Sequence, residues 1–184
     1  MCRNGVDTER FSPLPQPNLQ RPTAIFIGNG FVRKGLATAL EALVHAPEFQ
    51  LQVIGTDRRL AAYKSLSRKL RVDERVFFLG HRSNPEFFIK KAHVLVLPTR
   101  YDPSANVCLE AMACGVPFVS TPKNGATEIA PFDWMACPSD PIAFAKSMQV
   151  SLREVGVGDK CRQIALNHRS ELAYERLRKC LMSQ

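Results

Sequence analysis

The stretch Thr23-Ala24-Ile25-Phe26-Ile27-Gly28-Asn29-Gly30 decides the fold, because it joins a wholly apolar run to a glycine-rich turn. A short apolar run that ends in such a turn is typical of a buried strand. Beyond the turn, apolar residues recur at helical spacing until Pro47 stops the helix: Leu36, Ala39, Leu40, Leu43 and Val44. The sequence therefore predicts a strand over residues 24–27, a turn, and a helix that ends near residue 46.

The same alternation of apolar runs and helical segments repeats along the chain. Further apolar strands are predicted over residues 51–54, 76–79, 94–97 and 116–120. The helices predicted between them cover residues 59–70, 85–92 and 106–114, with Pro85 at the first helical position and Asn84 as a candidate N-cap. Strands that are apolar throughout are covered on both faces, so the sequence predicts an α/β fold with a Rossmann-like, doubly wound parallel sheet.

The two ends of the chain differ from this regular middle. Residues 1–22 hold four prolines without an apolar period, and we interpret them as an extended lead-in rather than a packed element. Asp140-Pro141 predicts a helix start, with Phe144, Met148 and Leu152 on one face, and a last helical stretch is predicted from residue 160 to 181. We expect a lead-in at 1–22, a domain at 23–155 and a C-terminal helical segment at 156–184.

The composition fits a globular protein and excludes several other classes. The chain has 184 residues, 45% of them hydrophobic, which argues against disorder. No stretch approaches the ~18 consecutive apolar residues of a membrane-spanning helix, and the N-terminus lacks the apolar core of a signal peptide. We therefore expect a cytoplasmic protein. Its six cysteines are scattered without a Cys-x-x-Cys pair, which predicts reduced, buried thiols and no metal site.

Ligands are expected at four loops that follow the predicted strands, over residues 28–35, 55–59, 80–84 and 98–106. The first loop brings Arg33 and Lys34 to a helix start, which favours binding of an anion. A plain glycine turn with a solvated Arg-Lys pair is the alternative. The loop is neither a Walker loop nor the dinucleotide fingerprint, because the third glycine of the latter would fall on Arg33.

The segment over residues 98–117 places two carboxylates around a helix start. Asp102 lies in the loop, Glu110 lies two turns into the helix, and free backbone N–H groups between them would face the same pocket. An acid in a largely apolar helix usually has a partner or a ligand. The pair could hold the hydroxyls of a sugar and a ribose, with phosphate left to the amides and Lys34. The alternative is that Asp102 is a turn residue and Glu110 a surface acid.

This combination resembles the C-terminal, donor-binding domain of retaining glycosyltransferases of the GT-B fold, specifically family four. The pattern is most similar to lipopolysaccharide core glucosyltransferases, through the Gly-x-x-Phe-x-Arg-Lys-Gly loop at 28–35 and Leu-Glu-Ala at 109–111. The resemblance covers residues 4 to about 148, and residues 4–11 look like the family's interdomain connector. It implies that the acceptor-binding N-terminal domain is absent, so we expect the chain alone to bind nucleotide weakly and to transfer no sugar.

The resemblance also implies the reaction. The whole enzyme would transfer a hexose with retention from a nucleotide diphosphate sugar, expected to be UDP-linked, without a metal ion or other cofactor. The acceptor would be a glycan or a lipid-linked glycan of lipopolysaccharide or another surface polysaccharide. A nucleotide-sugar epimerase of the GT-B type is the alternative within the fold. A basic nucleic-acid-binding domain is disfavoured, because aromatic and basic residues are not interleaved as in an RNA-recognition module.

Individual roles follow from the same resemblance. The implied catalytic residues are Lys34 and Arg33, which would neutralise the donor diphosphate, and Asp102, which would contact the transferred sugar. Glu110 would hold the nucleotide ribose. The other implied donor-binding residues are Gly28, Asn29, Gly30, His81, Arg82, Ser104, Ala105, Asn106 and Val107. Residues 125–129 match a further family loop.

Two positions depart from the family pattern. Asn29 stands where the family usually has arginine, so Arg33 would have to supply that charge. Asp102 stands where the family has glutamate, which shortens the reach to the sugar by one methylene group.

The charge excess has one main source. The chain carries 25 Lys plus Arg and 17 Asp plus Glu, a net charge of +8, and residues 56–75 hold seven cations against three acids. We expect a solvated helix face there, with peripheral contact to an anionic membrane as the alternative. Among other residues, His93, Phe132 and Trp134 are expected to be structural, whereas His81 could face the ligand pocket.

Overall fold

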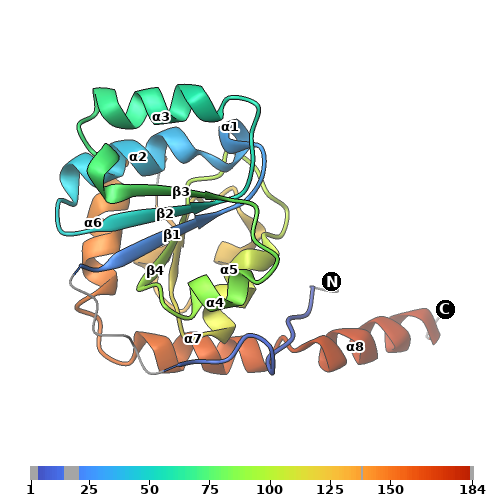
Figure 1. The fold of residues 1–184 in the computed structure, drawn as a ribbon. Helices are drawn as coiled ribbons and strands as arrows, with labels where there is room; N and C mark the ends of the chain where they lie inside the picture. The colour runs from blue at the N-terminus through green and yellow to red at the C-terminus, as the bar shows by residue number, and fades with distance from the viewer. Residues whose placement is uncertain (1–3, 15–20, 138, 183–184) are drawn as a thin grey trace.

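A five-stranded parallel sheet forms the centre of the computed structural model, which describes residues 4–14, 21–137 and 139–182. The strands are β1 (Thr23–Ile27), β2 (Gln50–Ile54), β3 (Val76–Gly80), β4 (Val94–Leu97) and β5 (Phe118–Ser120). Their order is β3-β2-β1-β4-β5, so the chain first moves outward from β1 and then crosses to its other side. The predicted doubly wound parallel sheet is confirmed (Figure 1).

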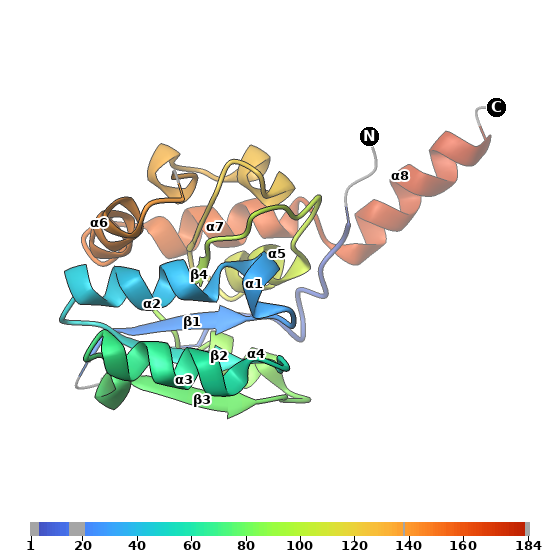
Figure 2. The ribbon, with the colours of Figure 1, turned by 90° about the horizontal axis from the view of Figure 1, so that it is seen from above.

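Helices cover both faces of this sheet. They are α1 (Phe31–Lys34), α2 (Leu36–His45), α3 (Leu60–Lys69), α4 (Pro85–Ile89), α5 (Asn106–Ala113), α6 (Pro141–Ser151), α7 (Val157–Leu166) and α8 (Ser170–Met182). Figure 1 shows α2 and α3 on one side of the sheet and α4, α5 and α7 on the other. Helix α2 packs against α6 and α5 against α7, whereas α8 projects away from the domain (Figure 2). In the described residues, none of the helices has the length and apolar character that a membrane crossing requires.

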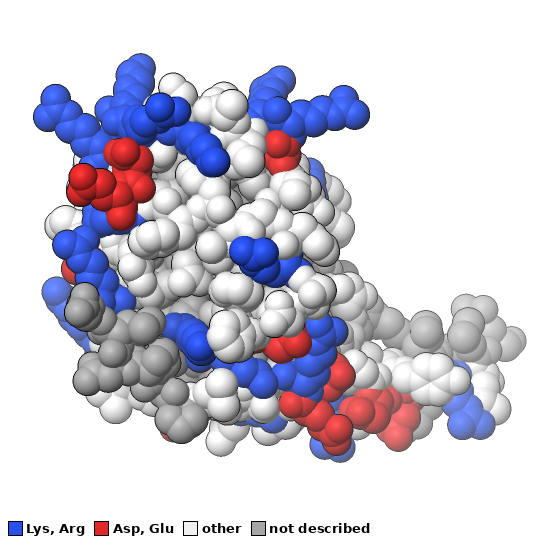
Figure 3. All heavy atoms as spheres, in the orientation of Figure 1, with Lys and Arg blue, Asp and Glu red and all other residues white. Residues whose placement is uncertain are grey.

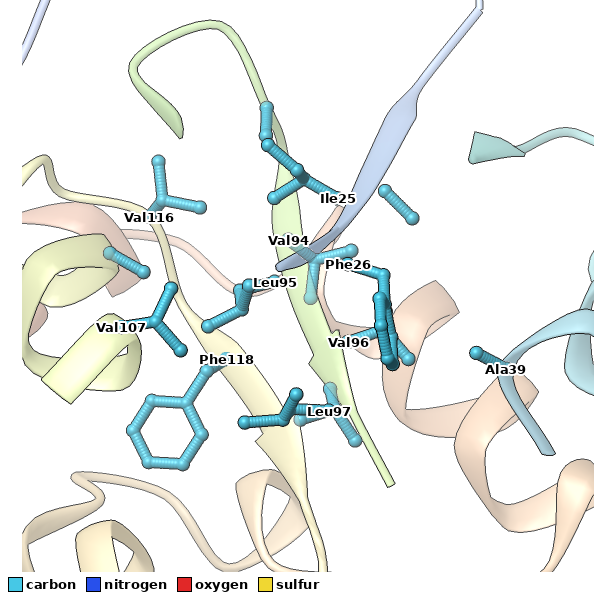
Figure 4. Close-up of a cluster of buried hydrophobic side chains, with 14 of the residues drawn as sticks. Ile25, Phe26, Ala39, Val94, Leu95, Val96, Leu97, Val107, Val116 and Phe118 are labelled. Carbon is cyan, nitrogen blue, oxygen red and sulfur yellow. The ribbon is translucent and has the colours of Figure 1, made fainter. Parts of the chain in front are cut away.

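The core contains side chains from both faces of the central strands. Phe26 on β1 and the neighbours Leu95 and Val96 on β4 are all buried, although neighbours on a strand point to opposite faces. Figure 4 shows Phe26 and Val96 pointing toward Ala39 of α2, while Leu95 points toward Val107 of α5. Burial of each large apolar side chain contributes about 1.5–3 kcal/mol. The non-alternating strands are therefore stable only between two helix layers.

The lead-in is packed at residues 4–14, contrary to the prediction of an extended segment over residues 1–22. Val6 and Phe11 are buried, and the backbone of Val6 exchanges two hydrogen bonds of 3.0 Å with His168 and Ser170. The guanidinium group of Arg162 also donates a hydrogen bond of 2.7 Å to the carbonyl of Phe11. Isolated apolar residues produce no period, so the sequence pattern does not reveal this contact. Part of the prediction lies outside the described residues, namely Pro15 and Pro17.

The predicted helix over residues 160–181 is two helices, α7 and α8, with a break after Leu166. At the break, Val6 and Arg169 form an isolated parallel bridge. The backbone there pairs with the lead-in instead of continuing the helix. Helix α7 also begins earlier than predicted, at Val157, directly after Gly156 with a positive φ of 72°.

Two smaller predictions at helix ends are wrong. Pro85 opens α4 as predicted, but the side chain of Asn84 makes no capping hydrogen bond. On α6, Phe144 and Met148 are buried as predicted, whereas Leu152 lies just beyond the helix and is exposed.

Within residues 56–75, Arg75 is the cation that does not lie on the solvated helix face. The guanidinium group of Arg75 donates hydrogen bonds to the carbonyl oxygens of Leu43, Ala46 and Phe49, at 3.0, 3.2 and 2.7 Å. Arg75 therefore satisfies carbonyl groups at and beyond the C-terminal end of α2. The six other cations of residues 56–75 are exposed, as predicted: Arg58, Arg59, Lys64, Arg68, Lys69 and Arg71.

Candidate functional site

The loops after β1 and β4 are joined at the carboxyl edge of the sheet. Gly35 has φ of 78°, and a Cβ atom there would collide with the carbonyl oxygen of Pro98. The carbonyl oxygen of Arg33 accepts hydrogen bonds from the backbone N–H of Arg100 at 2.8 Å and from the hydroxyl of Thr99 at 3.1 Å. Glycine at position 35 therefore allows the close approach that brings the predicted cations to the predicted acid.

Lys34, Arg33 and Asp102 form one charged cluster at this junction. The Nζ atom of Lys34 lies 2.5 Å from Oδ2 of Asp102, and Nη1 of Arg33 lies 3.3 Å from the same oxygen. The side chains of Lys34 and Asp102 are only 11% and 10% exposed, whereas that of Arg33 is 53% exposed. Burial raises the pKa of Asp102, but the hydrogen bond and charge of Lys34 outweigh it, so this pKa lies below its usual value.

Asn124 positions the loop that carries Asp102. The backbone N–H of Asp102 donates to Lys123 at 3.1 Å, and that of Gly125 donates to Asp102 at 2.9 Å. The buried amide oxygen of Asn124 accepts from the N–H groups of Ala105 and Ala126, at 3.4 and 3.1 Å. Sequence reasoning named the loop at 125–129 but missed Asn124. The available signal was its place directly before that loop.

The start of α5 presents free donors beside Asp102, as predicted. Among the described residues, no carbonyl or side chain accepts a hydrogen bond from the backbone N–H of Asn106 or Val107. The preceding N–H of Ser104 donates to Oδ1 of Asp102 at 3.3 Å. The side-chain oxygen of Asn106 accepts from the amide of Asn4 at 2.7 Å, which ties the lead-in to the helix start. These N–H groups are suited to binding an anion.

Glu110 is a partly buried acid without a hydrogen-bond donor in the described part of the chain. Burial raises its pKa, while the charge of Arg10 lowers it and that of Glu86 raises it. Arg10 and Glu86 form an ion pair of 2.9 Å next to it. Sequence reasoning missed both residues, because Arg10 comes from the lead-in and Glu86 from α4. The geometry leaves the carboxylate of Glu110 available to a ligand hydroxyl.

The first loop differs from the prediction of an open anion site at its helix start. Helix α1 has only four residues, and the N–H of its first residue, Phe31, donates to the carboxylate of Asp57 at 2.7 Å. Asn29 accepts a hydrogen bond from the N–H of Thr56 at 2.8 Å, so it links the first two loops. The adjoining residues Gly28 and Gly30 both have positive φ. The N–H group that the sequence predicted to bind phosphate thus already donates to Asp57, which the sequence did not single out.

His81 and Arg82 are surface residues of the third loop, over residues 80–84. Both are exposed, and the guanidinium group of Arg82 lies 5.9 Å from the ring centre of Phe88. Within the described residues, no hydrogen bond or ion pair joins either of them to Lys34, Asp102 or Glu110. Their predicted roles in donor binding stay predictions.

The residues expected to be structural pack as predicted. The ring of His93 accepts the N–H of Thr23 at 3.1 Å, and burial lowers the pKa of His93. Phe132 and Trp134 stack on each other at 5.6 Å and pack against the core. Four cysteines are buried and free, and burial raises the pKa of the Cys108 thiol to about 12. In the described part of the chain, no three His, Cys, Asp or Glu side chains cluster as metal ligands.

Comparisons with known proteins place this chain in a family. The sequence profile described as "Glycosyl transferases group 1" matches residues 7–155. The chain is 32% identical over 104 residues to the lipopolysaccharide core biosynthesis glycosyltransferase LpsE of Rhizobium meliloti (strain 1021), a match that covers 56% of this chain and 31% of LpsE.

Solved structures share the fold at low sequence identity. WaaG, a glycosyltransferase involved in lipopolysaccharide biosynthesis, has a TM-score of 0.80 and 21% identity over 95% of this chain and 54% of WaaG. Anabaena Alr3699/HepE in complex with UDP and glucose has a TM-score of 0.86 and 18% identity over 98% of this chain and 56% of that structure. This chain thus spans about a third of LpsE and just over half of the two solved proteins. The chain belongs to the glycosyl transferases group 1 family.

Proposed function

We propose that this chain binds the nucleotide diphosphate sugar donor of a retaining hexosyltransferase. The observation that carries the proposal is the cluster of Lys34 and Asp102 beside the free N–H groups of α5, with Glu110 two turns further along that helix. The N–H groups and Lys34 would bind the diphosphate and stabilise the charge that develops on it when the sugar leaves. Glu110 would accept hydrogen bonds from the ribose, and Asp102 would contact the sugar.

Relatives support the finer assignment of donor and acceptor. HepE is described in complex with UDP and glucose, which supports a uridine nucleotide for this chain. LpsE and WaaG are named for lipopolysaccharide biosynthesis, which supports a lipopolysaccharide or related glycan as the acceptor of the whole protein. We propose that the reaction needs no metal ion, because Lys34, Arg33 and the helix start supply positive charge. The chain alone is proposed to transfer no sugar.

Calorimetry with UDP, GDP and ADP tests the proposed donor site. We expect UDP to bind most tightly, and Lys34→Ala and Glu110→Ala each to weaken it by about tenfold, since a hydrogen bond to a charged group contributes about 1.5–3 kcal/mol. Lys69→Ala and Glu74→Ala are matched controls on the exposed surface and should change nothing. If neither site variant weakens binding of the preferred nucleotide, the proposed donor site is wrong. Sugar transfer by the purified chain would contradict the claim that it is inactive alone.

We also propose that the exposed cations of α3 and its flanks rest on an anionic membrane surface. Figure 3 shows Lys and Arg side chains gathered over α3. None of these cations forms an ion pair with a described carboxylate, so their charge is free to act on an external surface. The chain should sediment with vesicles that contain anionic lipid, and Lys64→Gln combined with Arg68→Gln and Lys69→Gln should abolish this. Equal sedimentation with neutral vesicles would refute it.

A further inference from the structure

A hollow of about 310 Å³ borders the junction of the first and fourth loops. Gly35 and Pro98 line its inner side, where the two loops touch. The lining of the hollow includes no Asp or Glu. It supplies two guanidinium groups and three hydroxyl groups, from Arg59, Arg100, Tyr63, Thr38 and Ser139. Neither Lys34 nor Asp102 lines this hollow, so it is distinct from the candidate donor site.

Tyr63 gives this hollow a polar group without a partner. Its ring packs edge-on against Phe31, with ring centres 5.4 Å apart, and the residue is only 8% exposed. No described residue forms a hydrogen bond with its hydroxyl group, and this oxygen is not sealed from solvent, so it is open to a ligand in the hollow. Burial and the charge of Asp57 raise the pKa of Tyr63, so its hydroxyl is protonated at neutral pH and can donate to a ligand.

The charges near Tyr63 favour an anion. Arg59 and Arg100 both act electrostatically on Tyr63, and neither forms an ion pair with a described carboxylate. The acid that also acts on Tyr63 is Asp57, whose carboxylate already accepts the N–H groups of Phe31 and Arg59, both at 2.7 Å. Asp57 therefore has its own donors and leaves the two guanidinium groups free for a ligand.

We propose that this hollow binds a phosphate group, either inorganic phosphate or the phosphomonoester of a small sugar phosphate. Guanidinium groups bind tetrahedral oxyanions through paired N–H donors, and the Tyr63 hydroxyl adds a donor from the floor. The volume lies at the lower end of the range of about 300–1,000 Å³ that small-molecule sites occupy. An uncharged sugar would leave both guanidinium groups without a counter-charge. The proposal is independent of whether the donor site binds a nucleotide.

An NMR titration of the ¹⁵N-labelled chain with inorganic phosphate, glucose 6-phosphate and glucose tests this site. The two phosphates should give saturable shifts at the amides of Thr38, Tyr63 and Arg100, and glucose should give none. Arg100→Gln should weaken binding by about tenfold and Tyr63→Phe by about threefold or more, as expected for lost hydrogen bonds to a charged ligand. Tighter binding of glucose 6-phosphate than of inorganic phosphate would identify a sugar phosphate, and equal binding the free ion.

Matched variants separate this site from general charge and from the donor site. Arg58→Gln removes a neighbouring exposed cation that does not line the hollow, and Lys34→Ala disables the donor site. Both should bind phosphate with unchanged affinity. Tyr63→Phe keeps the ring that packs on Phe31, so an unchanged spectrum away from the hollow confirms its fold. The proposal is overturned if phosphate gives no saturable shift, if the shifts cluster at Asn106 and Val107, or if Arg58→Gln weakens binding as much as Arg100→Gln.

Discussion

Asp102→Asn should increase the affinity of this chain for UDP while making the chain less stable. In the structure, Oδ2 of Asp102 lies 2.5 Å from Nζ of Lys34, the cation proposed to bind the diphosphate. A phosphate oxygen about 2.8 Å from Nζ, on the side away from the acid, would lie roughly 5 Å from the carboxylate. Two unit charges at that distance repel by about 0.8 kcal/mol in bulk water and about 3 kcal/mol at an effective dielectric constant of 20.

The smaller of these values is a lower limit, because the side chains of Lys34 and Asp102 are only 11% and 10% exposed and water screens them incompletely. Removal of the repulsion should therefore tighten UDP at least about fourfold. The same substitution leaves the amine of Lys34 largely buried without its counter-charge. We expect a loss of about 2 kcal/mol in the free energy of unfolding, less than the ~3–5 kcal/mol for a broken buried pair, because asparagine still offers an oxygen.

Titration calorimetry with UDP and urea denaturation measure the two effects. Asp73→Asn is the control, since it changes the net charge equally at an exposed position outside the cluster. A UDP affinity that is unchanged or weaker in Asp102→Asn would refute the idea that Asp102 and the diphosphate compete for Lys34. An equal rise in UDP affinity in Asp73→Asn would show that the effect comes from the net charge of the chain and not from the position of Asp102.

Three further substitutions test the burial of Glu110, the support of the Asp102 loop and the packing of the lead-in. Glu110→Gln should raise the free energy of unfolding at neutral pH. Burial raises the pKa of Glu110, so the stability linked to this group is present below its unfolded pKa of ~4.3 and is lost as pH rises through the folded pKa. Urea denaturation should show that the gain from the substitution shrinks at low pH, and a loss of stability at pH 7 would contradict this reasoning. Asn124→Ala should lower the free energy of unfolding by about 2–4 kcal/mol, because the N–H groups of Ala105 and Ala126 lose their acceptor. A change within the error of urea denaturation would contradict the view that Asn124 positions this loop. Arg162 donates three hydrogen bonds, to the carbonyl groups of Thr8, Phe11 and Ala113. Arg162→Met should therefore speed proteolytic cleavage within residues 4–14 but not within the sheet. Mass spectrometry of the cleavage products measures this difference.

The strands were predictable because their signal is local. The run over residues 24–27 is apolar on both faces, and the observed strand differs from the prediction by one residue. The meeting of Lys34 and Asp102 was predictable too, since carboxyl ends of parallel strands share one edge. Both features depend only on neighbouring residues and on the topology of the sheet.

The missed features depend on contacts between segments far apart in the sequence. Val6 is one apolar residue in a proline-rich stretch, and its bridge to Arg169 lies at the break between α7 and α8. Asp57 follows β2 but satisfies the first N–H group of α1. Asn124 looks like an ordinary loop residue until its burial and its bonds to Ala105 and Ala126 are known. Periodicity contains no information on these pairings.

The two departures from the family pattern act together on the charge of the site. Asn29 supplies a hydrogen-bond acceptor to Thr56 in place of a cation, so Arg33 and Lys34 are the cations beside Asp102. Because Asp102 binds both of them, the cluster has a net charge of about +1, less than a diphosphate requires. The free N–H groups at the start of α5, with roughly half a positive charge from the helix dipole, must supply much of the remainder. We expect a bound diphosphate to compete with Asp102 for Lys34, so the short acid limits how much of the charge of this cation is available to the proposed donor.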